Sequence, residues 1–130
     1  MIYNDKLQML NFEYLKNLNK EQKEAVSYLE GPLLIVAGAG SGKTKVLTSR
    51  IAHIIKSKKA YPNQILSVTF TNKASQEMQT RVSSMLKKEA IGLSWLGTFH
   101  SVSAKILRKH AEATGLNSNF SIIDQDDQIR

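Results

Sequence analysis

A glycine-rich stretch between an apolar run and a helical pattern constrains the fold of this chain more than any other feature. Residues 33–36 read LLIV, as expected of a strand buried on both faces of a parallel sheet. Residues 42–56 repeat apolar side chains at helical spacing. The stretch between them reads Ala37, Gly38, Ala39, Gly40, Ser41, Gly42, Lys43, Thr44. Strand, glycine-rich turn and helix in this order predict a phosphate-binding loop.

The residue types of this loop suit a nucleoside triphosphate. Glycines allow backbone N–H groups to converge on phosphate oxygens, and the following helix adds its free amides and the positive end of its dipole. Lys43 is predicted to reach the β- and γ-phosphates of ATP, and the Thr44 hydroxyl to ligate Mg²⁺. Ala37 stands where the strict pattern has glycine. The alternative is a glycine-rich helix-capping turn with a solvated Lys43.

Strand and helix patterns alternate along the rest of the chain. Strands are predicted at residues 65–70, around 95–96 and at 120–123, and helices at 19–29, 72–87 and 100–113, with another helix opening at Asp124. Residues 1–17 are an N-terminal extension or a short helix. We therefore predict an α/β fold, a parallel sheet of the P-loop NTPase type flanked by helices and incomplete at its C-terminus.

Charge and composition narrow the class of partner. The chain has 130 residues, a formal charge of +7 and no cysteine. The basic excess favours nucleic acid or an anionic membrane surface, and the lack of cysteine excludes disulfides and thiolate metal sites. Residues 1–5 do not open a signal peptide, and no apolar run approaches the roughly 20 residues that span a bilayer. We predict a cytoplasmic protein without a membrane partner.

Four segments in order resemble the opening of superfamily 1 DNA helicases of the UvrD/Rep/PcrA type. They are Leu18 to Gln22 (the Q motif), Ala37 to Thr44 (motif I), Thr69 to Ala74 with Glu77 and Met78 (motif Ia), and Gly97 to Ser101 (motif Ib). The resemblance covers residues 18–130 and implies a RecA-like fold. It also implies that residues 18–130 are the first part of the ATP-binding domain (1A), ending before the Walker B motif.

The resemblance assigns roles to individual residues. Gln22 would hydrogen-bond adenine, and the alternative is that it is only the capping-box partner of Asn19. Lys45, which stands where the family often has arginine, would lie at the nucleotide with less capacity to stack on a base. Single-stranded DNA would contact Phe70, Thr71, Asn72, Lys73, Thr98, His100 and Ser101. Phe70 could instead be a core aromatic residue at the end of a strand.

The function implied is that of the ATP-binding portion of a 3′-to-5′ DNA helicase. Such a protein uses ATP and Mg²⁺, translocates on single-stranded DNA and unwinds duplex DNA in repair or replication. Arg130 reads as a cut in a longer protein, and the 130-residue piece alone is expected to be inactive. A stand-alone P-loop module without motor activity is the competing interpretation, and a small kinase is a weaker third. An Asp-Glu pair after an apolar strand downstream of Arg130 would decide for the helicase.

Overall fold

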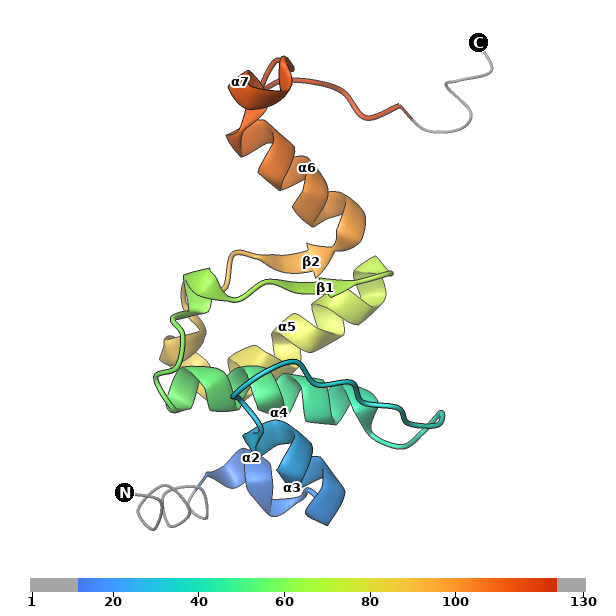
Figure 1. Cartoon of the computed structure of the whole chain (residues 1–130), viewed down its shortest axis with the longest axis vertical. Coiled ribbons are helices and arrows are strands. Elements are labelled where there is room, and N and C mark those ends of the chain that lie inside the picture. Colours follow the sequence, from blue (N-terminus) through green and yellow to red (C-terminus); the bar gives the residue numbers. More distant parts are fainter. Residues whose placement is uncertain (1–11, 124–130) are drawn as a thin grey trace.

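Helix α4 (Lys43–Lys56) lies between two other groups of helices in the structure, a computed structural model that describes residues 12–123 (Figure 1). Two short helices, α2 (Glu13–Lys16) and α3 (Lys20–Ser27), pack against one side of it. Their contact is a small apolar core made by Leu15, Leu18, Val26 and Val46. Helix α5 (Asn72–Leu86) packs against another side of α4 and encloses the larger core.

The larger core joins α4, α5 and the segment that leads into the sheet. Its buried members are Ile51, Ala52, Ile55, Ile65, Met78, Val82 and Leu86. The apolar residues of α5 recur at intervals of four, at positions 78, 82 and 86, so they share one face of the helix. That face holds α5 against α4, and α5 in turn contacts both strands of the sheet.

The sheet consists of two short parallel strands within the described residues. Strand β1 (Ser67–Thr69) pairs with β2 (Leu96–Thr98), and Thr69 lies opposite Thr98. Short 3₁₀ turns, η1 (Pro62–Gln64) and η2 (Lys87–Ala90), precede the two strands. Because α5 connects β1 to β2, these elements form a βαβ unit whose strands end at the same edge.

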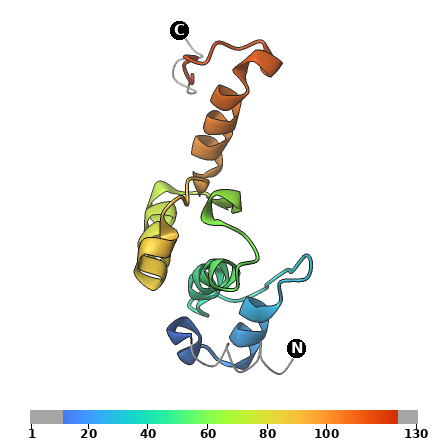
Figure 2. The same cartoon turned by 90° about the vertical axis from the view of Figure 1, so that its left-hand side faces the viewer.

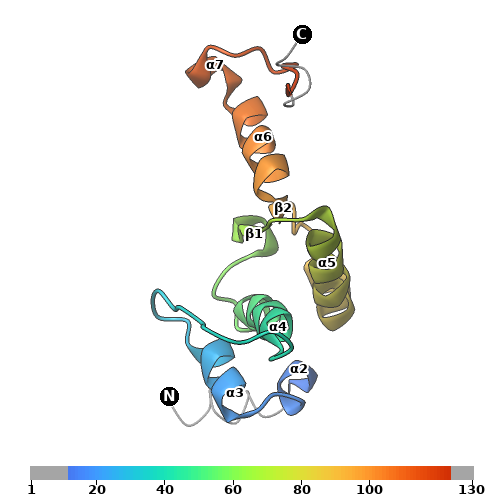
Figure 3. The ribbon, with the colours of Figure 1, turned by 90° about the vertical axis from the view of Figure 1, so that its right-hand side faces the viewer.

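Helix α6 (Phe99–Lys109) leaves the end of β2 and projects from the rest of the molecule, as Figures 2 and 3 show from opposite sides. A break at His110 separates it from α7 (Ala111–Thr114). Gly115 ends α7 in the left-handed conformation, with φ of 69°. The helix expected over residues 100–113 is therefore present in two pieces, and a glycine ends the second.

The helices match the sequence-based expectations more closely than the strands do. Helices α3, α4 and α5 confirm the helices predicted at 19–29, 42–56 and 72–87 within two residues at each end. The predicted strand at 65–70 is shorter, and the one near 95–96 begins at Leu96. The result confirms an α/β chain with a parallel sheet, and the helix predicted from Asp124 lies outside the described residues.

Two predicted strands are wrong. Residues 33–36 and 120–123 have no strand conformation, and the run expected to be buried is open to solvent, with Leu34 and Val36 86% and 87% exposed. The physical reason is the same in both places. A strand exists only where a neighbouring strand takes its backbone hydrogen bonds, and within residues 12–123 β1 and β2 pair only with each other.

Candidate nucleotide and nucleic-acid site

The glycine-rich loop ends at the N-terminus of α4, where its backbone needs conformations that glycine provides. Gly40 and Gly42 have φ of 74° and 81°, in the left-handed region. Gly42 is the N-cap of α4 and supplies no capping side chain, and the first turn of α4 contains no acidic residue. The first amides of a helix have no partner within the helix, so this end can accept an anion. Lys43 and Thr44 follow at once and are exposed.

Open space lies beside two glycines of the loop. A Cβ atom added at Gly38 or Gly40 would meet no other atom within 4 Å. The Ser41 amide bonds to the Gly38 carbonyl at 3.3 Å, and the Ser41 hydroxyl donates to the same oxygen, which closes the turn. Ala37 lies half-buried before this turn, and Ala39 is exposed within it. Backbone amides and the exposed Lys43 are the groups that this loop could offer to an anion.

Gln22 is attached to this loop as well as to its own helix. Its Oε1 accepts from the Asn19 amide at 2.9 Å, and the Asn19 side chain accepts from the Gln22 amide at 2.8 Å. This confirms the capping box of α3. The Nε2 of Gln22 donates to the Ser41 carbonyl at 3.1 Å, so both the oxygen and the nitrogen of its side-chain amide have partners. A Cβ at Gly42 would lie 3.0 Å from that Nε2, which shows how closely the two segments approach.

Lys45 points to a different part of the molecule. Its Nζ donates to the Asn17 carbonyl just beyond α2. One turn further along α4, Arg50 donates through Nη1 to the Ala25 carbonyl at 2.6 Å and to the Tyr28 carbonyl. Both cations hold α2 and α3 against α4. The structure therefore brings Gln22 to the glycine-rich loop and gives Lys45 a hydrogen bond to the Asn17 carbonyl.

The second group of candidate residues lies where β1 ends and α5 begins. Phe70, Thr71, Asn72 and Lys73 are all exposed. Phe70 is 88% exposed, so the alternative that it is a core residue is wrong. The Thr71 hydroxyl accepts from the Ala74 amide at 3.1 Å and caps α5. In an open parallel sheet this carboxyl edge is where ligands bind.

The corresponding residues after β2 have more internal partners. Thr98 is buried, and its hydroxyl accepts from the Ser101 amide at 3.1 Å and donates to the Ser101 hydroxyl at 3.1 Å. The Ser101 hydroxyl in turn lies 3.1 Å from the Thr98 carbonyl. Thr98 and Ser101 thus form the N-terminal cap of α6, while His100 is exposed beside them.

Phe99 is a residue of this edge that the sequence-based assignment missed. Its ring centroid lies 5.2 Å from that of Phe70, and its side chain is 46% exposed. A signal was available, since the dipeptide Thr-Phe occurs in both motif segments, at 69–70 and 98–99. The glycine loop, the start of α5 and the start of α6 all lie on the right-hand side of Figure 1.

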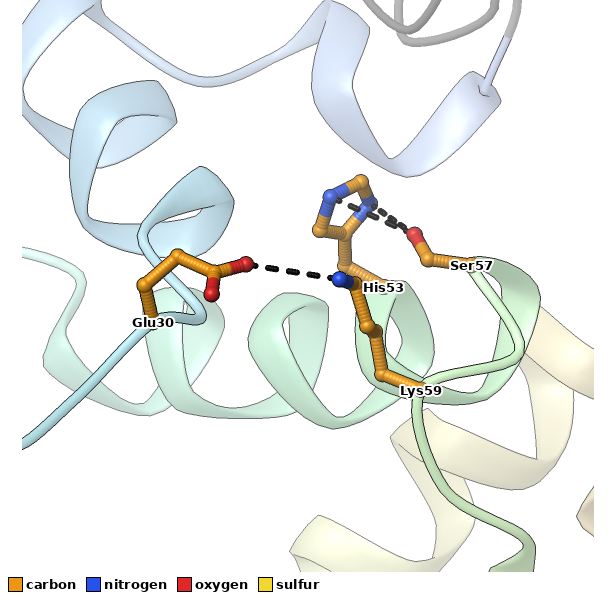
Figure 4. Close-up of polar contacts among 4 residues, drawn as sticks. All are labelled: Glu30, His53, Ser57 and Lys59. Carbon is orange, nitrogen blue, oxygen red and sulfur yellow. Dashed lines mark hydrogen bonds and ion pairs between the residues drawn. The ribbon is translucent and has the colours of Figure 1, made fainter.

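His53, to which no role was assigned from the sequence, is buried within the face of α4 that contacts α2. Its Nδ1 lies 3.0 Å from the Tyr14 hydroxyl, and Ser57 Oγ lies 3.4 Å from its Nε2. Figure 4 shows His53 with Ser57, beside the exposed ion pair of Lys59 and Glu30 at 3.3 Å. Burial, with the nearby Arg50 charge second, lowers the pKa of His53, and burial raises the pKa of Tyr14.

The fold and this edge define a class, an α/β protein with a glycine-rich loop at a helix N-terminus and exposed side chains at the ends of its parallel strands. Residues 18–130 match the model of the UvrD/REP helicase N-terminal domain family. The chain belongs to this family.

The chain is also similar to curated helicases. It is 54% identical to the ATP-dependent DNA helicase PcrA of Staphylococcus epidermidis, over 88% of this chain and 16% of that protein. It is 54% identical to DNA helicase II of Rickettsia typhi, over 96% of this chain and 18% of that protein. The chain thus spans less than a fifth of the length of these relatives. Within residues 12–123, no helix is long and apolar enough to cross a membrane.

Proposed function

We propose that this chain is the ATP-binding part of an ATP-dependent DNA helicase that translocates 3′-to-5′ on single-stranded DNA and unwinds duplex DNA. Residues 18–130 would form the first part of its ATP-binding domain, of RecA-like fold. The single observation that carries the proposal is the glycine loop at the bare N-terminus of α4, with Gln22 attached to it. The named activities of relatives that share about half of its sequence support the same proposal.

The loop supplies the nucleotide site in this proposal. Residues Ala37 to Gly42 would surround the phosphates with backbone amides, Lys43 would neutralise the β- and γ-phosphates, and Thr44 would ligate Mg²⁺. When bound, Mg²⁺ neutralises phosphate charge during transfer. Gln22 would reach adenine only by exchanging one of its present partners, and Lys45 would have to leave the Asn17 carbonyl. Nucleotide binding is therefore expected to break the present contacts of Gln22 or Lys45.

Titration of fluorescent Mg-ATP tests the nucleotide site. Lys43→Ala is expected to abolish binding, because the phosphates lose their point counter-charge. Lys59→Ala is the matched control, since it removes the same charge from the exposed ion pair with Glu30. Equal affinities for the wild type and Lys43→Ala would contradict the proposal. The 130-residue chain is also expected to show no DNA-stimulated ATPase, and turnover comparable to that of an intact helicase would mean that the catalytic residues are misassigned.

The carboxyl edge supplies the DNA site. Phe70 would stack on a base, and Asn72, Lys73 and His100 would contact the backbone of single-stranded DNA. The Thr98 and Ser101 hydroxyls already donate to partners within the cap of α6, so their contacts with phosphate would share donors in use. The Thr71 hydroxyl acts in its own cap as an acceptor. Because the attraction is largely electrostatic, binding should be no tighter than about 10⁻⁴–10⁻⁶ M and should weaken with added salt.

A further inference from the structure

The pairing of Phe70 with Phe99 follows from the strand register. Thr69 lies opposite Thr98 in the parallel ladder, and each threonine is followed by phenylalanine. Neighbouring strands run about 4.8 Å apart, so two side chains one residue beyond a registered pair lie at nearly that separation. The ring centroids are 5.2 Å apart with planes inclined at 41°. The two rings therefore form one aromatic surface built by two different strands.

The position of Phe99 is fixed by its backbone. It is the first residue of α6, directly after the cap residue Thr98. The strand end and α6 approach so closely that a Cβ on Gly97 would lie 2.6 Å from the Ser101 hydroxyl and 3.3 Å from Val102 Cγ2. Phe70 lacks comparable support, because 88% of its side chain is exposed. The ring of Phe99 is thus the better anchored of the two.

The charges around these rings favour an anionic partner with flat apolar groups. Neither α5 nor α6 has an acidic residue in its first turn, and exposed Lys73 and His100 flank the pair. The whole chain has a charge of +7. Single-stranded nucleic acid combines a phosphate backbone with bases that stack on aromatic rings. An exposed aromatic pair in a basic setting matches that chemistry.

The spacing of the rings decides how a base can bind. A base inserted between two rings needs carbon contacts of about 3.5 Å on each of its faces, so the rings would have to stand about 7 Å apart. At 5.2 Å they leave no room for it. A base must therefore stack on an outer face of the pair. Phe70, 88% exposed against 46% for Phe99, offers the larger free face, and Phe99 contacts its other side.

We propose that Phe99 is a positioning residue that holds the ring of Phe70 as a stacking platform for one base of single-stranded nucleic acid. This role rests on the proposed DNA site. It predicts that Phe99 acts only through Phe70, so that the two residues form one unit. Removing the ring of Phe99 should therefore weaken nucleic-acid binding less than removing the ring of Phe70.

The test compares two labelled oligonucleotides of equal length, one of thymidine and one fully abasic, by fluorescence anisotropy at one salt concentration. Phe70→Ala should weaken binding to the thymidine strand by about 5- to 150-fold. Phe99→Ala should weaken it by a smaller factor, the double variant should be no weaker than Phe70→Ala, and Phe99→Tyr should restore binding. None of these variants should change binding to the abasic strand. Tyr61→Ala, which removes another exposed ring, is the control.

Thermal unfolding of each variant shows whether Phe99 holds the ring of Phe70 or stabilises the fold as a whole. Should Phe99→Ala lose stability, Phe99→Leu keeps an apolar side chain without a flat ring and should still weaken thymidine binding. Unchanged thymidine binding in both Phe99 variants, beside a loss in Phe70→Ala, would overturn the role of Phe99 and leave the DNA site intact. Equal losses on both strands would assign Phe99 to folding alone. A wild type that binds neither strand would overturn the DNA site and this role with it.

Discussion

The hydroxyl of Tyr14 lies 3.0 Å from Nδ1 of His53, and this contact joins α2 to α4 across 39 residues of sequence. The ring of Phe12 stacks on Tyr14 with centroids 5.3 Å apart, and it meets His53 edge-on. Protonation of His53 is unfavourable here, because the ring is buried and the positive charge of Arg50 is nearby.

This cluster makes stability depend on acidic pH. Because the pKa of His53 is lowered in the folded chain, the unfolded chain binds the proton first as pH falls below about 6.5. The contribution of neutral His53 is fully present above that pH and is lost as pH falls toward the lowered pKa. Melting temperatures measured across this window should fall for the wild type. His53→Gln should flatten the dependence.

Arg50 should contribute both to stability and to this pH response. Its guanidinium bonds to two carbonyls at the end of α3, and its charge lowers the pKa of His53. Arg50→Met keeps the apolar stem and should cost about 2 kcal/mol in unfolding free energy, the range for hydrogen bonds from charged groups. The pKa of His53, followed by NMR, should rise in the same variant. Lys59→Met should change neither quantity, because an exposed ion pair contributes little.

Gln22→Glu separates the two hydrogen bonds of the Gln22 side chain, the one in the capping box and the one to the glycine-rich loop. Glutamate can still accept from the Asn19 amide and preserve the capping box, but it cannot donate to the Ser41 carbonyl. We expect nearly wild-type stability of the chain with weaker binding of both Mg-ATP and Mg-tripolyphosphate, because the phosphate loop loses its tether. If only Mg-ATP binding falls, Gln22 acts on adenine and the tether has no role in binding.

Gly97→Ala should destabilise the end of β2. The new Cβ would lie 2.6 Å from the Ser101 hydroxyl, a distance at which one of the groups must move. A cost of about 1–3 kcal/mol is expected from overpacking. Adding Ser101→Ala should recover part of it by removing that hydroxyl. Gly38→Ala, where the added Cβ meets no atom within 4 Å, is the control, and an equal loss in both single variants would exclude the steric explanation.

The sequence predicted those elements that carry their own local signal. Helices α4 and α5 were predicted because a periodic apolar face needs no knowledge of its partner, and the cap at Asn19 and the glycine end at Gly115 are equally local. Residues 33–36 show where prediction from a local signal fails. An apolar run indicates burial, but strand pairing depends on a second segment that periodicity does not identify.

In the candidate site, too, the local features were predictable from the sequence and the long-range contacts were not. The position of the glycine loop at the start of α4 was predictable from residue types in one stretch. The bond of Gln22 to Ser41 and the contact of Phe70 with Phe99 were not, since each joins residues at least 19 positions apart. The second contact depends on strand register, which the sequence does not specify for strands of three residues.

The exposed apolar residues at 33–36 have a consequence for any work with this polypeptide in solution. Four uncharged residues with branched side chains, which pair with no strand within residues 12–123, form a template on which another copy can align and hydrogen-bond. We expect concentration-dependent self-association through this stretch, detectable by light scattering and suppressed by Val36→Lys. Aggregated copies would concentrate positive charge and mimic tight DNA binding, so affinities should be measured only where scattering shows single molecules.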